Sequence, residues 1–254
     1  MSAAIGRGAV RHGVFFLSKY FILSYIAAGL TEASGMGKYD KSIALWDDIF
    51  SQEAPIFPKY RTSGNAAFDR GLQWLTEDAE TVLDFGCGNG ILLFLCSLYG
   101  TSAHTGIDLS PAAIRSATER AKNAPRGTFR FICGSLDALR DIETASADAV
   151  VLANIIDNLY PEDAAAVLAE IRRILRKNGR ILLKLNPCLT AEQITSWNIR
   201  VISGNLLDDG MVLWNRTTEE WDTFLGARFR IAHFEEIYYE EHEQYNRLYL
   251  LINE

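Results

Sequence analysis

Apolar runs and amphipathic segments alternate along the chain between residues 81 and 196. Short, mostly apolar runs are typical of strands that are buried on both faces of a sheet. They predict strands at 81–84, 103–108, 128–132, 148–153 and 180–185. The segments between them repeat apolar residues at helical spacing and predict helices at 90–99, 111–122, 136–141 and 161–177. Five successive strand–helix units indicate an α/β fold with a parallel sheet and helices on both faces.

Residues with capping and terminating propensity mark the predicted helix ends. Ser110 followed by Pro111 is an N-cap followed by proline at the first helical position, and Gly100 is placed to end the preceding helix. Further boundary signals are the cap Ser63 for a helix reaching Leu75, the Asn178–Gly179 stop, and the capping boxes Thr190/Gln193 and Thr217/Glu220.

Segments before and after these units follow other patterns. Residues 39–50 place Ile43, Trp46 and Phe50 on one helical face. Residues 199–216 predict a hairpin around Asp208-Asp209-Gly210, and 228–239 and 246–253 predict two long strands with the acidic residues 240–243 as the turn.

The junction after the first predicted strand combines an acid with three glycines. Asp84 is followed by Gly86, Gly88 and Gly90, and the next helix begins at once. Glycine allows positive φ and close approach of backbone to a ligand. A strand, a glycine loop and a helix N-terminus are expected to direct backbone N–H groups at one spot. We therefore expect a ligand site at the carboxyl end of this strand.

The spacing of the glycines restricts the ligand. The dinucleotide pattern G-x-G-x-x-G requires glycine where Ile91 stands, and no G-K-[ST] follows for a P-loop. Asp84 would repel a pyrophosphate and attract an ammonium group. Asp108, 18 residues beyond Gly90 at the end of the second strand, is placed to accept both hydroxyls of a ribose.

In these features the chain resembles the class I S-adenosylmethionine-dependent methyltransferases of small-molecule type. The resemblance covers about residues 60–254 and rests on D-x-G-x-G-x-G at 84–90 together with Asp108. It implies a Rossmann-like, seven-stranded, mostly parallel sheet with an antiparallel last strand and helices on both faces. It also implies S-adenosyl-L-methionine as cofactor and transfer of a methyl group to a small molecule, mainly by positioning.

The resemblance also implies the cofactor-binding residues. They are Asp84, Phe85, Gly86, Cys87, Gly88, Asn89, Asp108, Leu109, Ser135, Leu136 and Asn154. Asp84 and the backbone of 85–88 would hold the methionine end, Asp108 the ribose, and Leu109 the adenine ring. Ser135 stands where the family often has an acid for the adenine amino group. This leaves Ser135, the Leu136 amide and Asp137 as alternatives.

The residues after the fourth strand assign no catalytic base. Many small-molecule members of the family carry histidine where Asn158 stands, and an amide is no base near neutral pH. For Asn154 and Asn158, the alternative role is turn chemistry. For the whole protein, the alternatives are a non-catalytic or partner-dependent cofactor-binding protein, another transfer chemistry on the same fold, and methylation of protein or RNA.

Two segments outside the sheet are expected to cover the cofactor and shape the acceptor pocket. They are 36–62, with Tyr39, Trp46, Tyr60 and Arg61, and 199–216, with Met211 and Trp214. For each aromatic residue, ordinary core packing is the competing interpretation.

Charge and cysteine content narrow the class further. The 254 residues carry a net charge of −7, which disfavours nucleic acid as partner. The four cysteines form no C-x-x-C pair, so we predict reduced thiols, no metal site and a cytoplasmic location.

Residues 1–35 form a separate, basic segment. Lys19 interrupts its apolar stretch, so the segment has no uncharged run long enough to predict a membrane span. It also has features of a signal peptide. We expect instead a loosely ordered extension that translation from an upstream start codon would add. A single domain is expected to follow over 36–254. The oligomeric state is left open.

Overall fold

The apolar runs pair side by side in one seven-stranded sheet. The computed structural model describes residues 37–240 and 243–254, so the expected extension at 1–35 lies outside the described residues. The strands of the main sheet are β1 (Thr81–Phe85), β2 (Ala103–Asp108), β3 (Thr128–Cys133), β4 (Ala147–Ala153), β5 (Leu175–Leu185), β9 (Arg230–Tyr239) and β10 (Gln244–Ile252). Their order is β3-β2-β1-β4-β5-β10-β9.

The pairing directions confirm the predicted fold class. Strands β1 to β5 pair in parallel, whereas β10 runs antiparallel to both β5 and β9. The order reverses between β1 and β4, since the chain moves from β1 toward β3 and then returns to β4 on the other side. Such a switch point opens a crevice at the carboxyl ends of the strands, where ligands bind in open α/β sheets.

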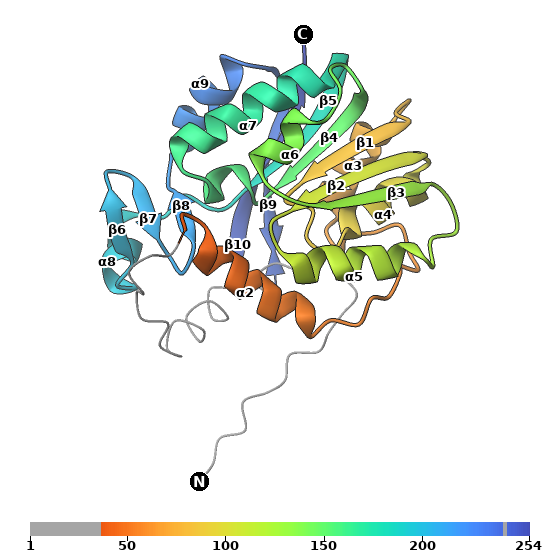
Figure 1. Cartoon of the computed structure of the whole chain (residues 1–254). Helices are drawn as coiled ribbons and strands as arrows, with labels where there is room; N and C mark the ends of the chain where they lie inside the picture. The colour runs from red at the N-terminus through yellow and green to blue at the C-terminus, as the bar shows by residue number, and fades with distance from the viewer. Residues whose placement is uncertain (1–36, 241–242) are drawn as a thin grey trace.

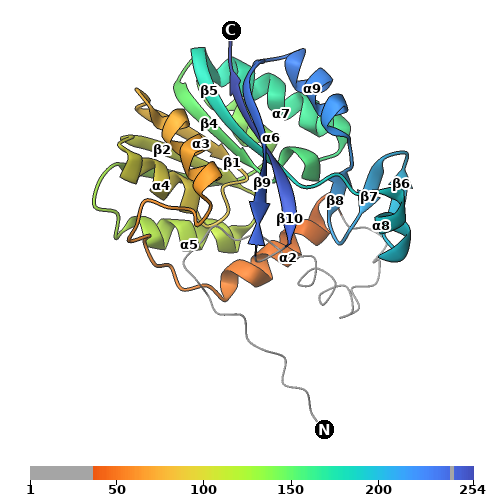
Figure 2. The same cartoon turned by 180° about the vertical axis from the view of Figure 1, so that it is seen from behind.

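Helices cover both faces of the sheet (Figures 1 and 2). One face packs on α3 (Ala66–Thr76) and α4 (Ile91–Tyr99), the other on α6 (Leu136–Arg140), α7 (Pro161–Ile174) and α9 (Thr218–Gly226). The helix α5 (Pro111–Ala121) packs on β2, β3 and α2. Fully buried side chains such as Trp221, Tyr249 and Phe68 fill the two cores.

Two elements lie beyond the carboxyl ends of the strands. The helix α2 (Asp40–Ser51) crosses this edge between α5 and a small sheet of β6 (Arg200–Ser203), β7 (Leu206–Asp208) and β8 (Val212–Trp214). The 3-10 turn η1 (Ile156–Asn158) contacts β8, and α8 (Ala191–Ser196) precedes the small sheet. None of the helices in the described residues is long and apolar enough to cross a membrane.

Two predicted boundaries differ from the structure. The cap of α3 is Asn65, whose side chain accepts the N–H groups of Ala67 and Phe68, and Ser63 is not the cap. The helix α7 ends at Ile174 rather than near Asn178, because Leu175 pairs with Ala147 of β4 and this pairing overrides helix propensity.

The expected hairpin at 199–216 is a three-stranded meander. The predicted turn at 208–210 joins β7 to β8, and a second turn joins β6 to β7.

Candidate active site

Asp84 stands at the carboxyl end of β1 and is almost fully buried, with 1% of its surface exposed. Neither of its carboxylate oxygens has a hydrogen-bond partner among the described residues. Burial raises the pKa of this carboxyl well above its usual range, and the nearby Asp108 carboxylate raises it further. A buried carboxylate without a partner is costly, and a cationic ligand group at this position would remove that cost.

The glycine loop after Asp84 is held by its own backbone N–H groups. The N–H groups of Gly86 and Cys87 donate to the Ile107 carbonyl, at 2.8 and 3.0 Å. The Gly88 N–H donates to Oδ2 of Asp108 at 2.7 Å. These donors therefore bond within the protein, which corrects the expectation that they point at a ligand. The loop's part in the site is its positive φ and its close approach to the cavity.

Asp108 stands at the end of β2 and orders the same loop. Besides the Gly88 bond, its Oδ1 accepts the Ser110 N–H at 2.8 Å. Burial raises the pKa of Asp108, and these two N–H donors counteract that rise. Because each carboxylate oxygen can accept more than one hydrogen bond, two acceptor positions are left for hydroxyl donors such as those of a ribose.

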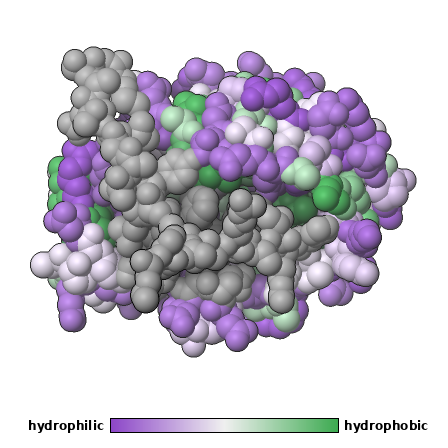
Figure 3. Space-filling model, turned by 90° about the horizontal axis from the view of Figure 1, so that it is seen from below, coloured by the Kyte–Doolittle hydropathy of each residue, from purple (hydrophilic) through white to green (hydrophobic). Residues whose placement is uncertain are grey.

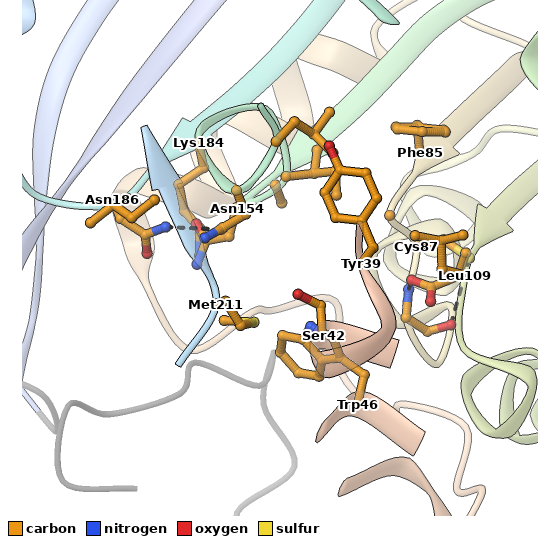
Figure 4. A pocket seen from close by; sticks show the side chains of 18 of the residues that line it. Tyr39, Ser42, Trp46, Phe85, Cys87, Leu109, Asn154, Lys184, Asn186 and Met211 are labelled. Carbon is orange, nitrogen blue, oxygen red and sulfur yellow. Dashed lines mark hydrogen bonds between the residues drawn. The ribbon is translucent and has the colours of Figure 1, made fainter. Parts of the chain in front are cut away.

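A single cavity of about 1030 Å³ runs along the carboxyl ends of β1, β2, β4 and β5. Every residue that the sequence predicts for the cofactor lines it: Asp84, Phe85, Gly86, Cys87, Gly88, Asn89, Asp108, Leu109, Ser135, Leu136 and Asn154. Figure 4 shows Phe85, Cys87 and Leu109 on one side of the cavity and Asn154, Lys184 and Asn186 on the other, with Tyr39 between them.

The alternatives for the adenine end differ in where they lie. Ser135 and Leu136 line the cavity. The Asp137 side chain is 86% exposed and bonds Arg140 of its own helix at 2.7 Å. Asp137 is thus turned to solvent, which leaves Ser135 and the Leu136 amide as the groups facing this end of the cavity.

The two asparagines after β4 have different surroundings. Asn154 has a left-handed backbone with φ of 55°, and its buried Oδ1 has no partner among the described residues. Asn158 donates from Nδ2 to the Val212 carbonyl of β8 at 2.8 Å, and its Oδ1 accepts from Asn186 at 3.1 Å. Asn158 therefore fastens η1 to the small sheet and to Asn186, and Asn154 lines the cavity.

Sequence reasoning missed three charged residues at the far end of the cavity. Lys184 of β5 and Arg247 of β10 line it, with 1% and 3% of their surfaces exposed, and Asp157 of η1 is fully buried beside them. Burial lowers the pKa of Lys184 well below its usual range and raises that of Asp157. The available signal for this cluster was Lys184, which directly follows the apolar residues 181–183.

The segments 36–62 and 199–216, which are expected to cover the cofactor, contribute some of their predicted residues to the cavity wall. Ile43, Trp46 and Phe50, the predicted helical face of α2, all line the cavity, as do Tyr39 and Met211. Near the middle of the face shown in Figure 3, hydrophobic side chains are visible among mostly hydrophilic ones.

Other aromatic and basic residues of these segments lie elsewhere. Trp214 packs edge-on against Trp221 and Phe224 in the core, so its predicted place in the cavity wall is wrong. Tyr60 is 75% exposed, and Arg61 stacks over Tyr99 outside the cavity.

Two acidic side chains fasten α2 and the segment after it over the cavity. Asp47 accepts from the Ser110 hydroxyl and from the Ala112 N–H at 2.9 Å, and so caps α5 from outside. Glu53 accepts from Asn89 of the glycine loop at 2.5 Å and lies 3.7 Å from buried Arg120. These bonds join α2 to the same loop and helix that form the Asp84–Asp108 end.

Comparison with known proteins agrees with this geometry. Residues 83–183 match the family model of a methyltransferase domain. The ribosomal protein L11 methyltransferase of Burkholderia mallei is 29% identical over 160 residues, which is 62% of this chain and 47% of that protein. The tRNA N(3)-methylcytidine methyltransferase of Schizosaccharomyces pombe is 27% identical over 199 residues, or 73% and 64% of the two chains. The chain thus spans about half the length of the first of these relatives.

Solved structures share the fold. The 1,6-didemethyltoxoflavin-N1-methyltransferase of Burkholderia thailandensis, solved with S-adenosylhomocysteine, superposes with a TM-score of 0.60 at 17% identity, covering 87% of this chain and 92% of that one. The N-methyltransferase NodS of Bradyrhizobium japonicum gives 0.58 at 15% identity, covering 84% and 99%.

The matched domain and the strand order agree with each other. Residues 83–183 resemble a methyltransferase domain, and the chain shares its fold with solved methyltransferases, one of which holds S-adenosylhomocysteine. The unpartnered Asp84 carboxylate and the free acceptor positions of Asp108 fit the amino group and the ribose of that ligand.

Proposed function

We propose that this protein transfers a methyl group from S-adenosylmethionine to a small organic molecule held in the same cavity. The observation that carries the proposal is the continuity of that cavity. It joins the Asp84–Asp108 end to a second end lined by Asn154, Lys184 and Met211. Its volume of about 1030 Å³ is at the upper end of small-molecule sites, enough for a cofactor and a second ligand.

The residues of the first end would hold the cofactor. Asp84 would accept hydrogen bonds from the amino group of its methionine part, and Asp108 would accept from the ribose hydroxyls. Leu109 would pack on the adenine ring, with Ser135 and the Leu136 amide at its edge. The Asn154 side chain would donate to the methionine carboxylate, because the N–H groups of Gly86, Cys87 and Gly88 are already bonded within the protein.

The second end would hold the acceptor close to the reacting methyl group. When bound, S-adenosylmethionine supplies a methyl group on a sulfonium, which is a strong electrophile. The protein's part is to align the acceptor and exclude water, and effective molarities show that such positioning alone gives large accelerations. Tyr39, Trp46 and Met211 form the apolar walls that would do this, and no general base is assigned.

A small acceptor is favoured by the position of α2. Bonds from Asp47 and Glu53 hold it and the segment that follows it across the carboxyl edge of the sheet, where a bulky acceptor would need to enter. The relatives that act on ribosomal protein L11 and on tRNA make protein and RNA acceptors the competing proposals. The net charge of −7 disfavours the tRNA alternative.

Two experiments test the proposal in sequence. Calorimetry with S-adenosylmethionine and S-adenosylhomocysteine should show binding, and failure of both to bind at about 1 mM would overturn it. A screen of a metabolite mixture, bulk tRNA and ribosomal protein with methyl-labelled cofactor should then place label in a small molecule. Label confined to tRNA or to protein would refute the small-molecule acceptor and leave the methyltransferase assignment standing.

A further inference from the structure

The charged cluster at the far end of the cavity suggests what kind of acceptor fits there. Arg247 lies on β10 with 3% of its surface exposed and lines the cavity. Its Nε and Nη2 donate to the Asn186 carbonyl at 3.0 and 2.7 Å, and its Nη1 donates to the Arg216 carbonyl at 2.7 Å. These bonds fix the guanidinium in place and use three of its five N–H donors.

The Arg247 guanidinium bonds no carboxylate directly in the part of the chain that the structure describes, although its charge opposes the rise that burial causes in the pKa of the Asp157 carboxyl. Among residues 37–240 and 243–254, no carboxylate forms a salt bridge with it. Glu236 stands opposite in the β9–β10 register and also lines the cavity, but it is exposed and makes no ion pair with Arg247. A buried guanidinium that is bonded only to carbonyl oxygens keeps its full positive charge, which is costly without an anion.

Asp157 is the buried acid beside Arg247. Its carboxylate accepts the Asn186 N–H at 2.6 Å, and among the described residues it forms no salt bridge with the guanidinium. Glu236 and Glu243 also line the cavity, and both are exposed.

The position of Arg247 separates it from the cofactor end. In the sheet order, β10 is three strands from β1, or about 14 Å at the usual spacing between strands. Asn186, whose carbonyl holds Arg247, lies across the cavity from Phe85, Cys87 and Leu109 in Figure 4. An anion bound by Arg247 therefore belongs to the acceptor and not to the methionine part of the cofactor.

We propose that Arg247 binds an oxyanion group of the methyl acceptor, either a carboxylate or a phosphate. This inference rests on the proposed function, because it names the acceptor class of that same site. Guanidinium binds both groups through paired, charge-assisted hydrogen bonds. The neighbouring apolar walls, with Met211 and Leu213, suit an aromatic or aliphatic body attached to that anion.

The test compares matched probes on the full-length protein saturated with S-adenosylhomocysteine. Benzoate, phenyl phosphate and the neutral benzamide are titrated by calorimetry. At least one of the two anions should bind about tenfold or more tightly than benzamide, and the tighter one identifies the oxyanion. Equal binding of all three by the wild-type protein would overturn the inference without any variant.

Variants locate the anion at Arg247. Arg247→Met should abolish the preference for the anion, and Arg247→Lys should keep part of it. Arg180→Met is the matched control, because Arg180 also bonds backbone carbonyls but at the opposite end of β5 and outside the cavity. A preference that survives in Arg247→Met would overturn the assignment.

The same titrations separate this inference from the proposed function. Binding of S-adenosylhomocysteine is measured first, and its absence contradicts the cofactor site. If S-adenosylhomocysteine does not bind, the three probes are compared on the protein without it. Intact cofactor binding together with indifference to the anion contradicts only the role of Arg247.

Discussion

Asp84 and Asp108 end adjacent strands, yet their surroundings give them different roles. Asp108 holds two backbone N–H groups of the protein itself, whereas Asp84 holds none. Asp108 is therefore ready to receive hydroxyl groups while it orders the glycine loop. Asp84 is a buried acid whose ionised form needs a cation.

The first prediction concerns Asp108. Asp108→Ala should weaken S-adenosylhomocysteine binding by about 1.5–3 kcal/mol, or about 10- to 150-fold, because charge-assisted bonds to the ribose are lost. Calorimetry measures the change. Asp137→Ala is the control, since its side chain is 86% exposed and bonds only Arg140. An Asp108→Ala affinity within about twofold of wild type would exclude the ribose contact.

The second prediction uses the raised pKa of Asp84. An ammonium group binds the ionised carboxylate more strongly, so ligand binding lowers this pKa and the affinity must rise with pH through the free-protein value. Calorimetry with S-adenosylhomocysteine between about pH 5 and 7.5 avoids titration of the ligand's amino group. Asp84→Asn should bind more weakly and lose this rise. A wild-type affinity that is flat over this range would argue against an Asp84–ammonium contact.

Local residues of the site were predictable, and distant ones were not. Asp84 and the three glycines lie within seven positions of the sequence, so their spacing alone identifies the loop. Arg247 meets Asn186 only through the pairing of β10 with β5, which joins residues about 60 positions apart. Sequence periodicity does not identify the partner of such a charge, although Lys184 beside apolar residues indicated a buried charge in this strand.

At the scale of elements, local propensity predicts where a helix begins. It does not predict where strand pairing ends that helix. The capping boxes at Thr190 and Thr217 form as expected, because each satisfies backbone donors within four residues. The end of α7 was misplaced, because Leu175 is drawn into β4 pairing and 98% of its surface is buried. The face of α2 was predicted correctly, and it lines the cavity while Trp46 and Phe50 also pack on α5.

The third prediction concerns the attachment of α2. Asp47 caps α5 from a different element, and loss of a cap costs about 0.5–2 kcal/mol. Asp47→Ala should therefore speed hydrogen exchange of the α2 amides by about 2- to 30-fold if they exchange through local opening.

A neighbouring acid on the same helix provides the comparison for Asp47→Ala. The Asp48 carboxylate bonds Gln52 one turn further along α2 and does not reach α5. Asp48→Ala should leave the exchange rates near those of the wild type. If both variants speed exchange equally, the effect comes from loss of helix charge and not from the cap on α5.

At the scale of the whole molecule, we expect the burial of Lys184 in β5 to reduce stability. Lys184 lies in the middle of the fold with 1% of its surface exposed, and burial lowers its pKa well below the usual lysine range. The unfolded chain then binds a proton that the folded protein holds weakly. Stability should rise with pH from the lowered folded pKa up to the ordinary value of about 10.4. Functional sites often carry such local costs.

The fourth prediction follows from that cost. Lys184→Met keeps most of the length of the side chain and removes its charge, so the free energy of unfolding in urea should increase at pH 7 by about 1–4 kcal/mol. The difference in unfolding free energy between the variant and the wild type should shrink as the pH approaches about 10.4. At that pH the lysine of the unfolded wild-type chain also loses its proton, so burial of the neutral amine no longer costs a proton. Lys177→Met, on the exposed start of the same strand, should change neither quantity by more than about 0.5 kcal/mol. A Lys184→Met protein less stable than wild type at pH 7 would mean that the ammonium is stabilised by its surroundings, and that the charged end of the cavity contributes to folding as well as to binding.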